Sequence, residues 1–297
     1  MKKLSLLITT LLVFIISCNK IDTSTDIFSI LLPVEVTSWD PEYAATVSRN
    51  IYVEEFTGHF CNNCPSGARE IKAIMEDHPA IILTAIHSTE LADPKPGNPP
   101  IYTNNYKTPM GDKISGDLGI KAIPKATINR MPVNATEWGF DRSQWRSVIA
   151  SINITDVSAG IELQCTVNEI KKEIEAQVAV TIIKAIPNPV QICLVLQQDS
   201  IISGQYDVSM PSGQQHIPDY VHEHMLRAGF NGNYGTKLTP NGRVEEQLKY
   251  TTTFKLNYEK YIPNANIPIV LSHCSVTAYL IDMETKEVLQ VACMHLH

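Results

Sequence analysis

The segment from Ile51 to Pro65 reads IYVEEFTGHFCNNCP, and its two cysteines are separated by two residues. Its first part, Ile51 to Phe56, is rich in β-branched and aromatic residues, which predicts a strand that ends at Thr57-Gly58. The following residues, Ser66 to Asp77, carry apolar side chains at helical spacing behind Pro65, which a first helical turn tolerates. The cysteines are therefore expected between the end of a strand and the start of a helix.

This placement favours thiol chemistry at Cys61 and Cys64. The N-terminal end of a helix stabilises a thiolate, which lowers the pKa of the first cysteine and makes it a nucleophile. The two-residue spacer lets the second thiol resolve a mixed disulfide. The order of strand, cysteines and helix resembles that of thioredoxin-like domains. That resemblance implies that Pro124, just before a predicted strand, is cis and faces the cysteines, and that Glu55 is a buried acid that takes a proton from Cys64.

Other interpretations of the two cysteines stay open. A zinc site would need two more ligands, which His59 and His87 could supply. The pair could instead be a permanent structural disulfide in a domain without redox activity. Glu55 could equally be an ordinary exposed strand residue, because its neighbour Glu54 faces the other way. Phe60, Asn62-Asn63 and Lys125 also depart from the usual thioredoxin residues, which are Trp, Gly-Pro and Thr.

The chain from 51 to about 154 alternates between strand and helix patterns. Strands are predicted at Ala80–Ile86 and Lys125–Asn129, and helices at Gly111–Leu118 and at Asp141–Ile152, where Asp141 is the expected cap. Leu91 to Pro109 holds five prolines and is expected to be a long, stiff surface loop. We predict that this loop lies over or beside the cysteines; the alternative is a peripheral insertion.

After Thr155 the apolar residues recur with a period of two. The pattern predicts seven strands, at Ile161–Val167, Ile174–Ile183, Val190–Gln197, Tyr220–Leu226, Leu248–Leu256, Val270–Ile281 and Val288–Leu296. Seven strands with turn-rich gaps indicate an antiparallel β-sandwich of immunoglobulin type. The fold class expected for the chain is thus α/β followed by all-β.

Strand phase also predicts where the late cysteines point. Pairing Met283 with Lys286 across the last turn would set Cys293 opposite Val276, so that Cys293, Cys274 and Cys165 point inward and Cys193 points out of the core. In one strand, His222 and His224 would share a face, either as a metal-binding pair or, as we favour, as part of a strand-end network.

The first residues resemble a lipoprotein signal. Met-Lys-Lys is followed by an apolar run from Leu4 to Ile16, which is too short to cross a bilayer, and then by Ser17-Cys18. The stretch Ile15 to Cys18 resembles a bacterial lipobox, which implies that Cys18 is lipidated. A plain signal peptide with a chance cysteine is the alternative.

Composition excludes several classes of protein. The chain has 297 residues, with 24 Lys plus Arg against 31 Asp plus Glu, a net charge of −7. This balance argues against a nucleic-acid-binding surface, which needs clustered basic residues. No later segment approaches 18 continuous apolar residues, so the only expected membrane contact is through lipid on Cys18. No cofactor or metal is expected.

Two segments together resemble a known family. Val53 to Pro65, and Tyr220 to Arg227 followed by Gly232 and Gly235, are similar to the outer-membrane-protein-28-related lipoproteins of Bacteroidetes. The resemblance implies an envelope protein, lipid-anchored in the outer membrane at its periplasmic face or at the cell surface. The domains expected are a signal peptide (1–17), a lipidated tether (18–45), a thioredoxin-like domain (46–155) and an immunoglobulin-like domain (156–297).

Two functions follow from these features. In the first, the protein exchanges disulfides with the thiols of exported proteins: Cys61 attacks, Cys64 resolves, Glu55 relays a proton and Pro124 shapes the substrate face. In the second, it is a tethered binding or adhesion module for an unknown envelope partner, and the Cys61–Cys64 disulfide is structural.

Overall fold

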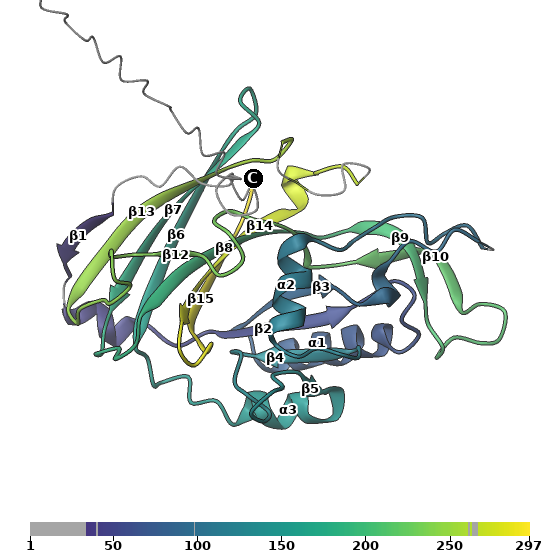
Figure 1. Cartoon of the computed structure of the whole chain (residues 1–297), viewed down its shortest axis with the longest axis horizontal. Coiled ribbons are helices and arrows are strands. Elements are labelled where there is room, and N and C mark those ends of the chain that lie inside the picture. The colour runs from purple at the N-terminus through teal and green to yellow at the C-terminus, as the bar shows by residue number, and fades with distance from the viewer. Residues whose placement is uncertain (1–33, 40, 98, 261, 263–266) are drawn as a thin grey trace, which may run out of the picture.

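A computed structural model describes residues 34–39, 41–97, 99–260, 262 and 267–297. The expected signal peptide and Cys18 lie outside these residues. The described chain is mostly β-structure, arranged in a nine-stranded sheet, a four-stranded sheet and a two-stranded sheet, together with three α-helices (Figure 1).

The nine-stranded sheet contains strands from both halves of the sequence. Its order is β15-β14-β8-β11-β3-β2-β4-β5, and β12 pairs with β8 beside this path. Strand β3 pairs in parallel with β2 on one side and with β11 on the other. The strands are β2 (Ile51–Thr57), β3 (Ile81–His87), β4 (Lys125–Ile128), β5 (Phe140–Asp141), β8 (Val190–Gln198), β11 (Met225–Gly229), β12 (Thr236–Lys237), β14 (Cys274–Asp282) and β15 (Val288–His295).

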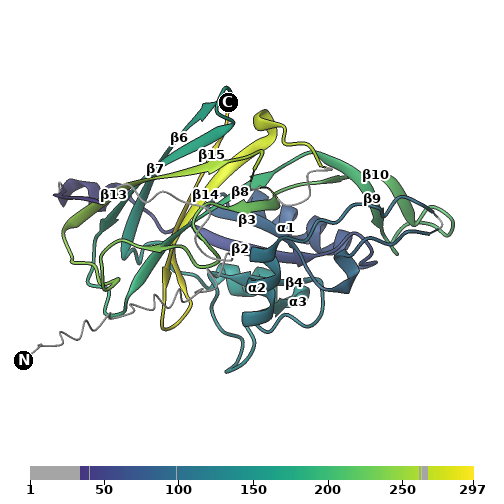
Figure 2. The ribbon, with the colours of Figure 1, turned by 45° about the horizontal axis from the view of Figure 1, so that its top comes forward.

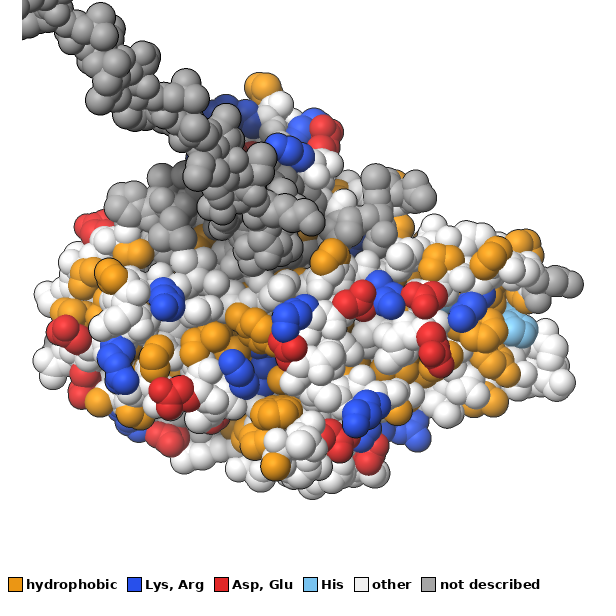
Figure 3. All heavy atoms as spheres, in the orientation of Figure 1, with side chains coloured by type: hydrophobic (Ala, Val, Ile, Leu, Met, Phe, Trp, Pro, Cys, Tyr) orange, Lys and Arg blue, Asp and Glu red, His pale blue; other side chains and the backbone are white. Residues whose placement is uncertain are grey.

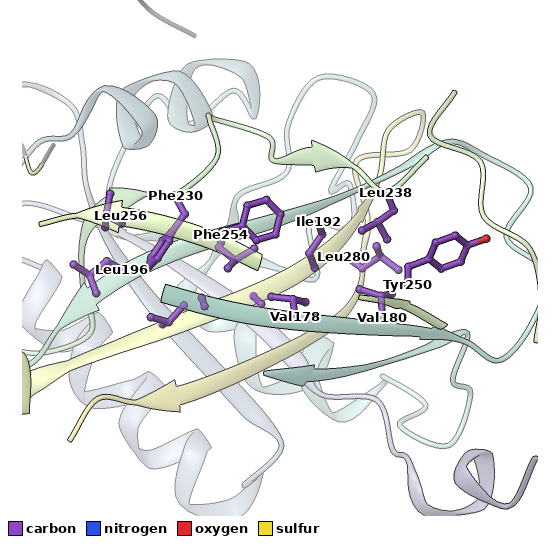
Figure 4. Packing of buried hydrophobic residues seen from close by; sticks show 14 of the residues in the cluster. Val178, Val180, Ile192, Leu196, Phe230, Leu238, Tyr250, Phe254, Leu256 and Leu280 are labelled. Carbon is purple, nitrogen blue, oxygen red and sulfur yellow. The ribbon is translucent and has the colours of Figure 1, made fainter. Parts of the chain in front are cut away.

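The four-stranded sheet is antiparallel and packs face to face on β8 and β14. Its order is β1-β13-β7-β6, with β1 (Glu35–Ser38), β6 (Ala159–Asn168), β7 (Glu173–Ile182) and β13 (Leu248–Asn257). Alternate residues of these strands point inward, so Val178 of β7 and Phe254 of β13 meet Ile192 of β8 and Leu280 of β14 (Figure 4). This is the largest apolar core of the molecule.

Three helices cover the sheet around β2. They are α1 (Cys64–Asp77), α2 (Pro109–Asp117) and α3 (Arg142–Ala150), and Figure 2 shows them gathered around β2, β3 and β4, away from β6, β7 and β13. Alternate residues of β2 serve two different cores: Val53 packs with Ile71 of α1 and Trp145 of α3, whereas Phe56 packs with Ile114 of α2. Both faces of β2 are therefore buried.

Among the described residues, no helix combines the length and the apolar content needed to cross a bilayer.

The helices α1, α2 and α3 and the strands β2, β3 and β4 lie where the sequence pattern predicts them, whereas the two-residue strand β5 was not predicted. The N-terminus of α3 has the expected cap, a capping box in which Asp141 pairs with Gln144. The peptide bond between Ile123 and Pro124 is cis, as expected.

Two strand predictions in the second half need correction, and the two-residue strand β12 was not predicted. Tyr220–Leu226 is not one strand: β10 (His216–His222) ends before His224, whose φ of 54° breaks the strand, and β11 follows. Val270–Ile281 begins too early, because a 3₁₀ turn at Leu271–His273 precedes β14. The sequence pattern also missed β9 (Ile201–Tyr206), which pairs with β10 in the two-stranded sheet.

Two of the four late cysteines face a different way from the prediction. A bulge between Leu280 and Ile281 shifts the register, so Cys293 pairs with Thr277 and is exposed. Cys193 is fully buried, because α2 and β2 cover the face of β8 that was expected to lie outside the core. Cys274 is buried as predicted, Cys165 is half-buried against the sandwich core, and all four are free thiols.

Candidate functional site

Cys61 and Cys64 form a disulfide at the point where β2 turns into α1. A turn closed by the Cys64 N–H donating to the Cys61 carbonyl (3.3 Å) brings the two residues to a Cα–Cα distance of 5.4 Å. Cys64 is the first residue of α1, and Pro65 occupies the first turn, where a missing N–H costs nothing. The predicted order of strand, cysteines and helix is therefore present.

Glu55 lies buried beside this disulfide. It is 3% exposed, its Oε1 atom has no hydrogen-bond partner, and burial raises the pKa of its carboxyl to about 8. Glu55 and Cys64 line the same small cavity, of about 40 Å³. The raised pKa favours the protonated carboxyl at neutral pH, and this carboxyl shares a cavity with Cys64, the residue that would need a proton when the disulfide opens.

Pro124 reaches the same region from the other side. A Cβ atom placed on Gly67 of α1 would lie 2.8 Å from Glu55 Oε1 and 3.2 Å from Pro124 Cβ. Both side chains therefore pack against the helix at this glycine, one turn after Cys64, and only a residue without a side chain leaves room for them. The structure thus places Glu55 and Pro124 against Gly67 of α1, the helix that begins at Cys64.

The β9–β10 hairpin covers the disulfide, which the sequence did not predict. Cys61 is 2% exposed and Cys64 is 1% exposed. The Tyr206 N–H donates to the His59 carbonyl (2.9 Å), the Val208 N–H donates to the Asn62 carbonyl (3.0 Å), and Gln205 Nε2 donates to the Cys61 carbonyl (3.0 Å). The turn signal Pro211-Ser212-Gly213 between two segments that hold β-branched and aromatic residues could have indicated a hairpin, but not its position on the cysteines.

The proline-rich loop lies beside the cysteines, as predicted. The Phe60 N–H donates to the Leu91 carbonyl (3.0 Å), and the His59 ring shares a hydrogen bond with the Asp93 carbonyl (2.9 Å). The ring of Tyr102 stands edge-on to Phe60, with centroids 5.0 Å apart. The loop therefore forms one wall of the site, next to the covering hairpin.

Four buried rings meet where these segments join. The centroid of Tyr106, from the loop, is 5.4 Å from His59, 5.0 Å from His87 at the end of β3 and 5.4 Å from His222 at the end of β10. Each histidine has at least one ring nitrogen without a partner. Burial lowers the pKa of His59, lowers that of His87 well below its usual value and lowers that of His222 to about 3. The three imidazoles are therefore neutral, and we name them with Tyr106 the ring cluster.

The positions of the histidines test the two metal sites that the sequence left open. His222 ends β10 and His224 lies in the break before β11, where its Nδ1 is 3.2 Å from Asp199, so the two do not share a strand face. The histidines that could have completed a zinc site belong to the ring cluster, and the cysteine sulfurs are bonded to each other. In the part of the chain that the structure describes, no three His, Cys, Asp or Glu side chains are arranged to hold a metal ion.

A groove of about 740 Å³ extends from the site along α1 and β10. It shares Glu55, Ala68, Tyr220 and Glu223 with the small cavity next to Cys64, so the two spaces meet at the buried carboxyl. On the face of the molecule drawn in Figure 3, acidic and basic side chains are interspersed rather than gathered into a patch of one sign.

Glu54 has a role that the sequence did not indicate. It faces away from the disulfide, is fully buried, and forms an ion pair with Arg130, whose nitrogens lie 2.6 and 2.8 Å from the two carboxylate oxygens. Arg130 also donates to the hydroxyl of Tyr279 in β14 (3.0 Å). Glu54 thus links the first half of the chain to the second.

Comparison with known proteins places the chain in a family. The model of the family Outer membrane protein Omp28 matches residues 112–296, which is more than half of the chain. The chain belongs to the Omp28 family. This family is one of outer membrane proteins, and the matched range begins after Cys61 and Cys64.

Solved structures add a likeness in fold. HBP35 of Porphyromonas gingivalis aligns with a TM-score of 0.59 and 14% identity, over 84% of this chain and 76% of that one. A domain of the outer membrane lipoprotein Omp28 from the same organism aligns with a TM-score of 0.30 and 15% identity, over 48% of this chain and 90% of that one. No curated protein matches this Omp28-family chain by sequence.

Proposed function

We propose that the protein is a thiol–disulfide exchange protein of the cell envelope. In this proposal residues 46–155 are a thioredoxin-like domain and residues 156–297 an immunoglobulin-like one. The observation that carries it is the buried carboxyl of Glu55, whose Oε1 atom has no hydrogen-bond partner and which lines the same cavity as Cys64. A structural disulfide needs no buried acid at its side, and burying one costs free energy, so its presence argues for proton transfer.

The proposed reaction uses this chain's residues as follows. A substrate thiolate attacks the sulfur of Cys61, the bond between Cys61 and Cys64 breaks, and Cys64 leaves as a thiolate that takes the proton of Glu55. A second substrate thiolate attacks the mixed disulfide, the substrate disulfide forms, and Cys61 leaves as a thiolate. The substrate is oxidised and the cysteine pair is reduced. In the reverse direction, Glu55 removes the proton of Cys64 and a substrate disulfide is reduced.

The rate at which reduced Cys61 reacts with iodoacetamide, measured from pH 4 to pH 10, tests this proposal. We expect the pKa of Cys61 to lie below that of an ordinary thiol, about 8.5. We expect Glu55→Gln to slow exchange with a fluorescent peptide disulfide, because Gln cannot take the Cys64 proton. The matched control is Glu284→Gln, which changes an exposed acid in the last turn. A Cys61 pKa at or above 8.5, together with unchanged exchange in Glu55→Gln, would remove the catalytic role.

One observation favours a second candidate function. Both sulfurs belong to residues that are at most 2% exposed, which suits a disulfide that only holds the β2–α1 junction in a binding or adhesion module. A Cys61→Ser/Cys64→Ser variant that is less stable but still binds its envelope partner would support this function. Loss of a redox phenotype at full stability would contradict it.

We also propose that lipid on Cys18 holds the protein to the outer membrane. The support is the lipobox-like sequence before Cys18 and membership of an outer membrane protein family. Cys18→Ala is expected to move the protein from the membrane fraction to the soluble fraction. Cleavage by a protease added to intact cells would place the protein on the cell surface, and resistance would place it on the periplasmic face.

A further inference from the structure

The β9–β10 hairpin is joined to the rest of the molecule by two short junctions. Asp199-Ser200 connects β8 to β9, and Glu223-His224 connects β10 to β11. Ser200 (φ 58°) and His224 (φ 54°) both have a left-handed backbone, which is unfavourable for residues other than glycine and concentrates at switch positions. Within the described residues, β9 and β10 form a sheet of their own. The hairpin thus has the connections of a hinged element.

Side-chain hydrogen bonds between the two junctions add to the sheet pairing at the base of the hairpin, where Ile201 pairs with His222. The carboxylate of Asp199 accepts from the His224 N–H (2.6 Å), and the carboxylate of Glu223 accepts from the Ser200 N–H (2.9 Å). Each junction is therefore held by an acid from the other one. Such bonds can persist while the strands beyond them rotate as a unit.

The far part of the hairpin is docked on the cysteine loop by a small number of polar contacts. Besides the bonds from Tyr206, Val208 and Gln205, Asp207 forms an ion pair with Arg69 of α1 (2.7 Å). The Asp207 side chain is 1% exposed, whereas that of Arg69 is 54% exposed. This ion pair links the hairpin to α1, the helix that begins at Cys64.

We propose that the β9–β10 hairpin is a hinged cover, which must lift from Cys61–Cys64 before a thiolate can reach the disulfide. A thiolate must contact one of the two sulfurs, and in the closed state both are shielded. A hairpin of two strands is barely stable by itself, so lifting it costs less than unfolding the protein. The proposal deepens the exchange function and rests on it for its purpose, but its test measures access alone.

The test compares two rates in the full chain, the reduction of Cys61–Cys64 by dithiothreitol and the hydrogen exchange of the Tyr206 and Val208 amides. Mass spectrometry after alkylation distinguishes Cys61 and Cys64 from the free thiols. We expect Arg69→Ala to raise both rates about fivefold or more, because it removes a charged partner from the buried Asp207. Arg69→Lys keeps a charge near Asp207 and should restore most of the protection.

Arg146→Ala is the matched control, because Arg146 is also a half-exposed helix arginine in an ion pair, with Asp77 (2.6 Å), but lies on α3 away from the hairpin. It should leave both rates unchanged. Faster amide exchange in Arg69→Ala with unchanged reduction would overturn the proposal. If neither rate changes, the variant Arg69→Ala/Gln205→Ala is measured. It removes the bonds from Arg69 to Asp207 and Ser209 and the bond from Gln205 to the Cys61 carbonyl, and an unchanged reduction rate in it would overturn the proposal as well. Accelerated reduction in a protein without exchange activity would keep the cover and reject the proposed function.

Discussion

At the scale of single residues, Glu55 shows how a change of environment gives a common side chain an uncommon property. Neighbouring residues of β2 point to opposite sides, so Glu54 reaches Arg130 whereas Glu55 faces the cysteine side without a partner. Glu54 is therefore held by a buried positive charge, and Glu55 avoids the cost of a buried charge by keeping its proton.

The raised pKa of Glu55 predicts how stability depends on pH. Burial raises this pKa from 4.5 to about 8, so between these values the unfolded chain releases a proton that the folded protein keeps. The contribution of Glu55 to stability is complete below pH 4.5 and is lost as pH rises toward 8, by about 1.4 kcal/mol per pH unit.

Glu55→Gln should remove this loss, so that the variant becomes more stable than the wild type at pH 8. Urea unfolding at pH 5, 6.5 and 8 measures the effect. Glu284→Gln, at an exposed position, should keep the wild-type profile. A Glu55→Gln profile parallel to that of the wild type would show that Glu55 ionises in the folded protein.

At the scale of elements, the sequence predicted the helices and strands of the first half well, because each carries its own periodic pattern and its own end signals. Asp141 marks the start of α3, and the apolar run before His87 marks a buried strand. Part of the candidate site could be predicted for the same reason. Cys61, Cys64 and Glu55 are placed by one strand and one helix that are adjacent in sequence.

What the sequence did not predict depends on contacts between distant segments. Cys193 was placed outside the core because its strand was considered within a sandwich alone, whereas α2 covers that face. One bulge after Leu280 moved Cys293 to the other side of its strand. The hairpin over the disulfide comes from residues about 140 positions away, and no local pattern in either segment records that contact.

The buried histidines of the ring cluster make the stability of the protein depend on pH. His222 is faced by the rings of His87, Tyr106 and Tyr220. His59 lies near the charged groups of Asp93 and Lys95. His87 and His222 also line a cavity together with the carboxyl groups of Glu55 and Glu223. Burial lowers the pKa of His222 from 6.5 to about 3, so over this range the unfolded chain binds a proton that the folded protein does not. This contribution to stability is complete above pH 6.5 and is lost as pH falls toward 3.

His222→Phe should reduce the loss of stability below pH 6.5, by about 1.4 kcal/mol for each pH unit. Urea unfolding at pH 7 and pH 5 measures the change, and the exposed His273→Gln is the matched control. Protection of the Tyr206 amide, measured by hydrogen exchange at the same two pH values, shows whether the hairpin loosens first. Equal slopes in the wild type and in His222→Phe would contradict the prediction.

At the scale of the whole molecule, the change of pattern near Asp156 does not coincide with a break in packing. Met225 of β11 pairs with Ala85 of β3, so one sheet runs through both halves of the chain. Tyr52 and Tyr279 stack with ring centroids 4.8 Å apart, and they belong to a core that draws residues from both halves. At its start, the described chain also contributes β1 to the sheet of β13.

This shared packing predicts that the two halves unfold together, and Phe254→Ala tests it. Phe254 is buried between the two sheets of the sandwich, in a core separate from the one that holds Trp145, and its truncation should cost about 3 to 5 kcal/mol. Heat unfolding is followed by tryptophan fluorescence in a Trp39→Phe background, because Trp39 follows β1, which pairs with β13 of the second half. In this background fluorescence reports mainly the first half, through Trp138 and Trp145, and circular dichroism reports mainly the strands of the second. If the halves are one cooperative unit, Phe254→Ala lowers both midpoints equally. If the fluorescence midpoint stays in place while the other falls, each half unfolds by itself and the shared sheet does not couple them.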